Sequence, residues 1–340
     1  MSPACSMARS RQDLSALTRR QLLWGLGGGA LMPGAMAQGI GTTFPSKALR
    51  IVVPFGAGGV ADLTVRTVSR RMAETLGQPV VVDNRPGAGG VVAAELVAKA
   101  DPDGHTLLLI SNGTAVSAGL MKQLPYDPVR DFKSVGLLAT FDIAIIVPVD
   151  SRFANLAQLL QWARENPGRL NIGSINIGST QHLTAEWFKL VAGIQAQVVP
   201  FNGTPAVLTA LRGGQVDVAV EILGPVLPQL RGKALRALAV TSERRASALP
   251  DVPTAQEQGL KGLLAASWNG LAVPARTPAP VIDRLNKEIV SALQTPAVRQ
   301  QLMDMNLDPH PGTPLQAQEW LQQEIRAWGQ VIERAGIPRQ

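Results

Sequence analysis

The sequence predicts an α/β protein in which helices cover both faces of largely parallel sheets. Apolar β-type runs alternate with helical patterns along nearly the whole chain, and several runs are continuously apolar, as in parallel strands buried on both faces. Aromatic residues make up only 4% of the 340 residues, whereas Ala, Val, Leu and Gly are plentiful. This βαβα alternation predicts doubly wound sheets that bind ligands at the carboxyl ends of their strands.

The spacing of the apolar residues locates the expected elements. Strands are expected at Leu49–Val53, Val80–Val82, Thr106–Ile110, Val135–Ala139, Ile143–Val147, Leu170–Ile172, Gln197–Val199, Val216–Val220 and Ala234–Val240. Helices are expected at Asp62–Leu76, Gly90–Ala100, Leu156–Asn166, Gln181–Val191, Pro205–Arg212, Pro278–Leu293, Pro296–Met305 and Leu315–Ala335. The last helix carries an apolar stripe that we expect to pack on the core, formed by Leu321, Ile325, Trp328 and Ile332.

The first 37 residues are typical of an export signal and not of the fold. Thr18–Leu23 matches a twin-arginine box, Leu22–Met32 is a short apolar stretch, and Ala35–Ala37 is a small-residue cleavage site. The apolar stretch is shorter than the ~20 residues that a membrane span needs. We therefore expect cleavage after Ala37 and a periplasmic protein. The remaining chain, about 300 residues, predicts two domains, and the lack of a visible linker suggests more than one crossing between them.

Composition limits the chemistry of the mature chain. Its single cysteine, Cys5, lies in the signal, so neither a disulfide nor a thiolate is available. The signal's four arginines and one aspartate carry +3 of the formal net charge of +7, which leaves +4. These basic residues are scattered, so we expect no nucleic-acid partner. Among three widely spaced histidines only His182 has a possible second ligand at helical spacing, Glu186, so no metal site is expected.

Three turns from strand to helix are rich in glycine: Pro54–Asp62, Val82–Gly90 and Asn171–His182. The start of a helix leaves backbone N–H groups unpaired, and the helix dipole adds a positive partial charge there, so such a turn can bind an anion. In the third turn, Ser179 and Thr180 stand where an N-cap would lie. Hydroxyls beside free N–H groups suit a carboxylate, which accepts about four hydrogen bonds. The alternative for each turn is an ordinary tight connection.

An exported NAD(P)-dependent oxidoreductase is the competing interpretation of the first turn. Gly56–Ala61 fits G-x-G-x-x-A after a strand, and Asp83 could supply the acidic ribose contact. Against this, Pro54 removes a backbone donor, and the distance from Gly56 to Asp83 exceeds the usual ~20 residues. Neither a G-x-S-x-G elbow nor a G-x-x-x-x-G-K-[ST] loop occurs. We therefore expect no catalytic residues and no cofactor.

Many ordered segments together resemble the Bug-type solute receptors, the periplasmic binding proteins of tripartite tricarboxylate transporters. They are IVVPFGAGGVAD, VVVDNRPGAGG, KADPDGHTLLL, LPYDPVRDFKSVGLLA, RENPGRLNIGS, NIGSTQHLTAEWFK, VPFNGTPAVLTALRGGQVDVAV, LRALAVTSERR, LPDVPTAQEQG and WNGLAVPARTP. The resemblance implies a two-lobed type II periplasmic binding fold, a Venus flytrap, with each lobe a mostly parallel sheet flanked by helices. It implies one discontinuous lobe at 45–142 with 243–340 and a second lobe at 143–242.

The resemblance also implies the binding residues. One wall would contain Phe55, Gly58, Gly59 and Asp62, and the other Ser179, Thr180 and His182, with Asn202, Gly203, Thr204 and Glu221 beside it. Backbone groups and hydroxyls are expected to bind, while Asp62 braces its loop or caps its helix, because a bare aspartate would repel an anion. Glu221 stands where the family usually has Asp, and Asn202 stands where a Lys is frequent.

The function implied by the resemblance is that of a non-catalytic, monomeric receptor. It would capture a small carboxylate in the periplasm and deliver it to membrane permease subunits or signal to a sensor kinase. The identity of the carboxylate is not apparent from these residues.

Overall fold

The computed structural model describes residues 44–340, and the expected export signal lies outside the described residues. The strands are β1 (Leu49–Val53), β2 (Val80–Asn84), β3 (Thr106–Ser111), β4 (Phe132–Pro148), β5 (Leu170–Ile175), β6 (Ala196–Phe201), β7 (Val218–Ile222), β8 (Leu235–Val240), β9 (Ala266–Pro274) and β10 (Asp308–Pro309). The helices are α1 (Val60–Leu76), α2 (Val91–Ala98), α3 (Asn112–Leu120), α4 (Leu156–Glu165), α5 (Thr180–Ala192), α6 (Thr204–Arg212), α7 (Leu223–Arg231), α8 (Ala279–Gln294), α9 (Pro296–Asp304) and α10 (Pro314–Arg334).

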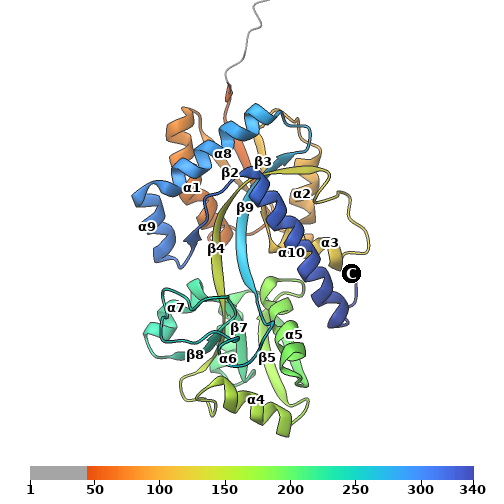
Figure 1. Cartoon of the computed structure of the whole chain (residues 1–340), viewed down its shortest axis with the longest axis vertical. Helices are drawn as coiled ribbons and strands as arrows, with labels where there is room; N and C mark the ends of the chain where they lie inside the picture. The colour runs from red at the N-terminus through yellow and green to blue at the C-terminus, as the bar shows by residue number, and fades with distance from the viewer. Residues whose placement is uncertain (1–43) are drawn as a thin grey trace, which may run out of the picture. The chain divides into compact units, whose positions relative to one another are not determined.

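The long strand β4 belongs to two sheets. As far as Asp142 it pairs with β9 in a first sheet ordered β2-β1-β3-β9-β4. From Ile143 it pairs with β7 and β8 in a second sheet that continues through β5 to β6. Figure 1 shows β4 running between the two groups of strands, with β9 beside it. The described chain therefore forms a two-lobed α/β fold, as expected.

The pairing within the two sheets is more mixed than expected. Four ladders among the described strands are parallel, namely β1–β2, β1–β3, β5–β6 and β5–β7. The five ladders that involve β4 or β9 are antiparallel. The two strands run in opposite directions because the chain leaves the first sheet along β4 and returns to it along β9. Parallel βαβ units thus build the outer part of each sheet, and the crossing strands join them.

The chain returns to the first sheet close to the point where it left. The Thr241 N–H donates to the Ile143 carbonyl at 2.9 Å, and the Ala265 N–H donates to the Thr241 carbonyl at 3.0 Å. Between these two returning residues, the chain stays against the second sheet. The Gln258 amide donates to the Leu238 carbonyl of β8 at 2.9 Å.

Most expected elements are present, with one merger and several omissions. The two strands expected at Val135–Ala139 and Ile143–Val147 form the single strand β4, because the polar residues between them continue the ladder with β9. Helix α7 was not expected, since it contains a glycine and two prolines. Helix α3 and strand β9 were also missed, because polar and small residues interrupt their apolar patterns.

The C-terminal helix α10 packs as its stripe predicts. Leu321, Trp328 and Ile332 are buried, and Ile325 is partly buried against the same core cluster. Helix α10 contacts α3 and β4 in the first lobe and α5 in the second. Figure 1 shows its C-terminal end beside α5. A helix of the first lobe thus also contacts the second.

Candidate ligand-binding site

In the first sheet, the carboxyl ends of the parallel strands face the crossing between the lobes. β1 and β3 run in the same direction. The last residue of β3, Ser111, pairs with Asn269, while the first residue of β9, Ala266, pairs with Asp142 just before β4 enters the second sheet. The loop at 54–59, which follows β1, therefore lies at the edge of the first sheet that faces the crossing.

The second sheet also turns its carboxyl ends toward the crossing. β5, β6 and β7 are parallel, and the last residue of β7, Ile222, pairs with Ile143, the first residue of β4 in this sheet. This edge brings together residues that were expected to form the second wall: Ser179, Thr180, His182, Asn202, Gly203, Thr204 and Glu221. Three separate strand ends contribute them, so the fold gathers residues that are up to 42 positions apart in sequence.

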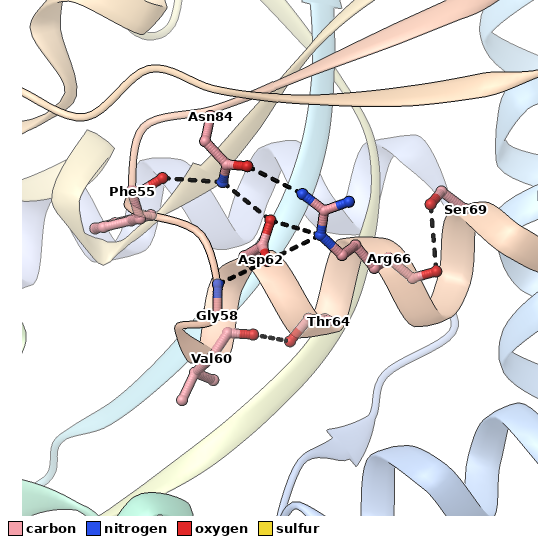
Figure 2. A network of polar contacts seen from close by, with 8 residues as sticks. All are labelled: Phe55, Gly58, Val60, Asp62, Thr64, Arg66, Ser69 and Asn84. Carbon is pink, nitrogen blue, oxygen red and sulfur yellow. Dashed lines mark hydrogen bonds and ion pairs between the residues drawn. The ribbon is translucent and has the colours of Figure 1, made fainter.

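The Asp62 carboxylate is buried inside the first loop, and its side chain is 3% exposed. It accepts hydrogen bonds from the Gly58 N–H at 2.8 Å, from Arg66 Nε at 2.9 Å and from Asn84 Nδ2 at 3.0 Å (Figure 2). Burial opposes its ionisation, but the hydrogen bonds from Arg66, Gly58 and Asn84 outweigh burial and hold the pKa of Asp62 below its usual value. Asp62 thus braces its own loop, as expected.

Asn84, at the end of β2, connects the second glycine turn to the first. Its amide donates to the Phe55 carbonyl and to Asp62, both at 3.0 Å, and its own carbonyl accepts from Arg66 at 3.1 Å. Figure 2 shows these contacts converging on the start of α1. The sequence did not predict a role for Asn84. Its place at the end of the VVVDN strand is the only local indication, because its partners Phe55 and Asp62 lie 29 and 22 residues away.

The start of α1 offers several backbone donors. Its N-cap, Gly59, supplies no capping side chain, and nothing in the described part of the chain accepts from the N–H groups of Val60, Ala61 and Asp62. The loop ahead of them is exposed, and Phe55 as a whole residue is 40% exposed. These N–H groups and the positive end of the helix dipole make this end of α1 able to bind an anion.

Ser179 is the N-cap of α5, as its position in the sequence predicts. Its hydroxyl accepts from the His182 N–H at 3.1 Å and donates to the Ile175 carbonyl at 3.1 Å. The hydroxyl is therefore used to shape the turn. Within the described residues, the N–H groups of Thr180 and Gln181 donate to no partner, so backbone donors are again available at the start of the helix.

Glu221 lies beneath the second wall and is fully buried. Its Oε2 accepts from Thr204 Oγ1 at 2.9 Å and from Gln181 Nε2 at 3.4 Å, which links it to the starts of α6 and α5. Burial raises the pKa of Glu221 to about 7, and its hydrogen bonds only partly oppose this rise. Gln181 is thus a further residue of this cluster, and it was not identified from the sequence. Asn202 is exposed beside Gly203, the N-cap of α6, which makes no side-chain capping hydrogen bond.

His182 also borders a cavity. It lines a space of about 320 Å³ together with Ile177 and Glu186 of the second lobe and the C-terminal residues 335–340. Burial lowers the pKa of His182. His182 thus lies in the first turn of α5, where its N–H donates to Ser179, and it also borders a space beside the C-terminal residues.

Asp83, the acid that a dinucleotide site would need, is paired with two arginines. Asp83 forms ion pairs with Arg50 and Arg85. The hydrogen bonds from Arg50 and, less strongly, from Arg85 outweigh burial and hold the pKa of Asp83 below its usual value.

Among residues 44–340, no three His, Cys, Asp or Glu side chains are grouped closely enough to hold a metal ion. No helix in the same range is long and apolar enough to cross a membrane.

Comparison with protein families gives a match over most of the described chain. The model of the tripartite tricarboxylate transporter family receptor matches residues 64–337. A protein encoded in the tcbD-tcbE intergenic region of Pseudomonas sp. strain P51 is 38% identical over 321 residues, which cover 94% of this chain and 95% of that protein. Protein BugT of Bordetella pertussis is 33% identical over 296 residues, which cover 86% of this chain and 91% of BugT.

Solved structures show the same fold with ligands. A Rhodopseudomonas palustris protein with adipate is 32% identical, with a TM-score of 0.79 over 87% of this chain and 99% of that chain. MatC from R. palustris with bound malate is 33% identical, with a TM-score of 0.75 over 85% of this chain and 100% of that chain. Both ligands are small dicarboxylates.

Proposed function

This chain belongs to the tripartite tricarboxylate transporter receptor family, a family of solute-binding receptors, and on that premise we propose that it binds a small organic carboxylate between its two lobes. The proposal extends to a periplasmic location after export and to a role without catalysis. The ligand would be delivered, by a monomeric receptor, to permease subunits of a tripartite tricarboxylate-type transporter or to a sensor kinase.

One observation carries the proposal: helix starts from both lobes have unused backbone N–H groups at edges that face the crossing. Val60 and Ala61 provide them at α1, and Thr180 and Gln181 provide them at α5. A carboxylate accepts about four hydrogen bonds, so it could use donors from both helices. The adipate and malate held by structural relatives have this chemistry.

Asp62, in the first turn of α1, is paired so that it need not repel a carboxylate. Asp62 is neutralised by Arg66 and by the Gly58 N–H. Ser179 and Thr204 use their hydroxyls to shape the turns, at the Ile175 carbonyl and at Glu221. We propose that backbone N–H groups are the main binding donors and that these side chains hold them in place. This reduces the direct role expected for the hydroxyls.

Closure of the lobes would follow from this division of the donors. A ligand bound to α1 alone would use half of them, and both sets can reach the same ligand only when the lobes approach each other. We propose a hinge where β4 passes from Asp142 to Ile143 and where the chain returns at Ala265 and Ala266. The first lobe would then comprise 45–142 with 266–340, and the second 143–265, which moves the expected return point from 242 to 265.

Thermal unfolding with a panel of mono-, di- and tricarboxylates tests the proposal. The purified protein is first freed of co-purified ligand by unfolding and refolding. A ligand at 100 times its Kd stabilises the folded state by about 2.7 kcal/mol, which raises the melting temperature by several degrees. If no carboxylate in the panel raises the melting temperature, and calorimetry detects no heat of binding, the proposal fails.

Gly59→Val tests whether the ligand binds at the start of α1, and Gly329→Ala serves as its control. Gly59 has φ −79° and ψ 169°, and the nearest atom to an added Cβ is the Gly56 carbonyl oxygen at 3.6 Å, so the fold accommodates valine. Its bulk at the start of α1 should weaken binding at least tenfold. Gly329 lies in α10 with nothing within 4 Å of an added Cβ, so binding should be unchanged. Equal affinity in both variants would place the site elsewhere.

A further inference from the structure

The Glu221 carboxyl group has an unusual environment for an acid at an anion site. It is fully buried, and its Oε1 has no hydrogen-bond partner within the described residues. Within the described residues, its Oε2 accepts from the neutral side chains of Thr204 and Gln181, and the neighbouring Ile222 N–H also opposes the rise in its pKa. A buried ionised carboxylate normally needs a cation or several strong donors. The two contacts at Glu221 supply neither.

In the described part of the chain, no element packed against β7 places a cation in an ion pair with Glu221. Two strands, β4 and β5, and three helices, α5, α6 and α7, pack against β7. The three helices carry His182, Glu186 and Lys189 on α5, Arg212 on α6 and Arg231 on α7. Strand β4 carries Lys133 and Asp142, and β5 carries no titratable group. Lys189 is paired with Glu186 at 2.7 Å, and none of these groups forms an ion pair with Glu221 in the described chain.

The position of Glu221 connects its charge to the ligand's charge. Its two partners, Gln181 and Thr204, are among the first residues of α5 and α6. An ionised Glu221 would place a negative charge beside the start of α6 and beside the start of α5, which is proposed to receive a carboxylate. Two negative charges at one site disfavour each other. A neutral Glu221 leaves the positive ends of both helix dipoles to the ligand.

We propose that this receptor takes up a proton when it binds its carboxylate, and that Glu221 is the group that holds this proton. The inference rests on the proposed function, because it concerns the same site. The proton comes from the buffer. Glu221 acts as a positioning residue: in its neutral form it connects the starts of α5 and α6 without placing a second negative charge beside the ligand.

Calorimetry with malate and adipate tests this. Binding heats are measured in buffers of different ionisation enthalpy at pH 6, 7 and 8, since the slope against that enthalpy gives the number of protons taken up. With the pKa of Glu221 at about 7, uptake should rise from near zero at pH 6 to most of one proton at pH 8. The affinity should fall up to about tenfold from pH 7 to pH 8.

Two variants assign the proton to its residue. Glu221→Gln keeps the size of the side chain without the titration, so proton uptake should vanish and the affinity should stay constant from pH 6 to 8. Glu186→Gln, on α5, removes a carboxylate that pairs with Lys189, and its proton uptake should equal that of the wild type.

The outcomes separate the two proposals. If the wild type binds a carboxylate but takes up no proton at any of the three pH values, the proposed role of Glu221 is wrong and the receptor function still holds. This result does not depend on whether Glu221→Gln folds. Uptake that persists in Glu221→Gln assigns the proton to another group and also overturns the proposal. If neither anion, nor any other carboxylate of the panel, binds at any of the three pH values, the receptor function itself is refuted and this inference falls with it.

Discussion

The Asn84 amide donates a 3.0 Å hydrogen bond to the Asp62 carboxylate and so joins the second glycine turn to the start of α1. A second hydrogen bond of the same length, from Asn84 to the Phe55 carbonyl, fixes the other side of the first loop. Because Asp62 is satisfied by its own loop, the start of α1 can present backbone donors beside a buried acid. The two glycine turns of the first lobe thus act as one unit.

Replacing Asp62 with Asn should destabilise the protein at neutral pH by about 1 to 3 kcal/mol, because it weakens a buried set of charge-assisted hydrogen bonds. The interactions of Asp62 depress its pKa, so their stabilisation is present above the ordinary pKa of an aspartate, about 4, and is lost as the pH falls through the lower folded value. Urea unfolding at pH 7 and at pH 3 should therefore show a difference from wild type that shrinks in acid.

Asp283→Asn is the matched control for this change. Asp283 lies exposed on α8, and its replacement should alter the free energy of unfolding by less than about 0.5 kcal/mol at pH 7. A cost at Asp62 no larger than the cost at Asp283 would show that the first loop does not depend on its acid.

The free energy of unfolding should fall as the pH rises from about 4.5 to 7, because Glu221 is buried. Its pKa is raised to about 7 from an ordinary value of 4.5, so the folded state holds a proton that the unfolded state has already lost within this range. This difference in pKa between the folded and unfolded states corresponds to about 3 kcal/mol of folding free energy. Relative to Glu221→Gln, the wild type should lose this amount between pH 4.5 and pH 7 and little more above it, as measured by urea unfolding across the range. Parallel curves for the two proteins would contradict the buried titration.

The sequence predicted the local structure around the first loop better than the side-chain contacts of that loop. The run IVVPFGAGGVAD placed the end of β1 and the start of α1 closely, because apolar runs and glycines report on local backbone structure. The contacts of Asn84 with Asp62, and of Thr204 with Glu221, join segments 22 and 17 residues apart. No local pattern reveals which side chains meet in this way, so the bracing partner Asn84 and the linking residue Gln181 were missed.

Replacing Ser179 with Ala should weaken both the fold and ligand binding. The change removes the N-cap of α5, which costs about 1 kcal/mol, and it frees the turn that aims the N–H groups of Thr180 and Gln181. Thr313→Ala is a matched control, because Thr313 caps α10 by accepting from the Gln316 N–H. Both variants should lose similar stability in urea, but only Ser179→Ala should lose affinity in calorimetry. Equal affinities would remove Ser179 from the site.

Gly224 tests the contact between the lobes beside the crossing. It lies in α7 of the second lobe, and a Cβ added there would overlap the backbone carbonyl oxygen of Met305, at the end of α9 in the first lobe. A backbone atom cannot rotate away, so Gly224→Ala should force α7 and α9 apart and cost about 1 to 3 kcal/mol. Gly329→Ala, in open space on α10, should instead be neutral or stabilising by up to about 1 kcal/mol, because alanine favours a helix. Urea unfolding distinguishes the two, and an equal effect at both glycines would mean that the lobes do not press against each other at α7.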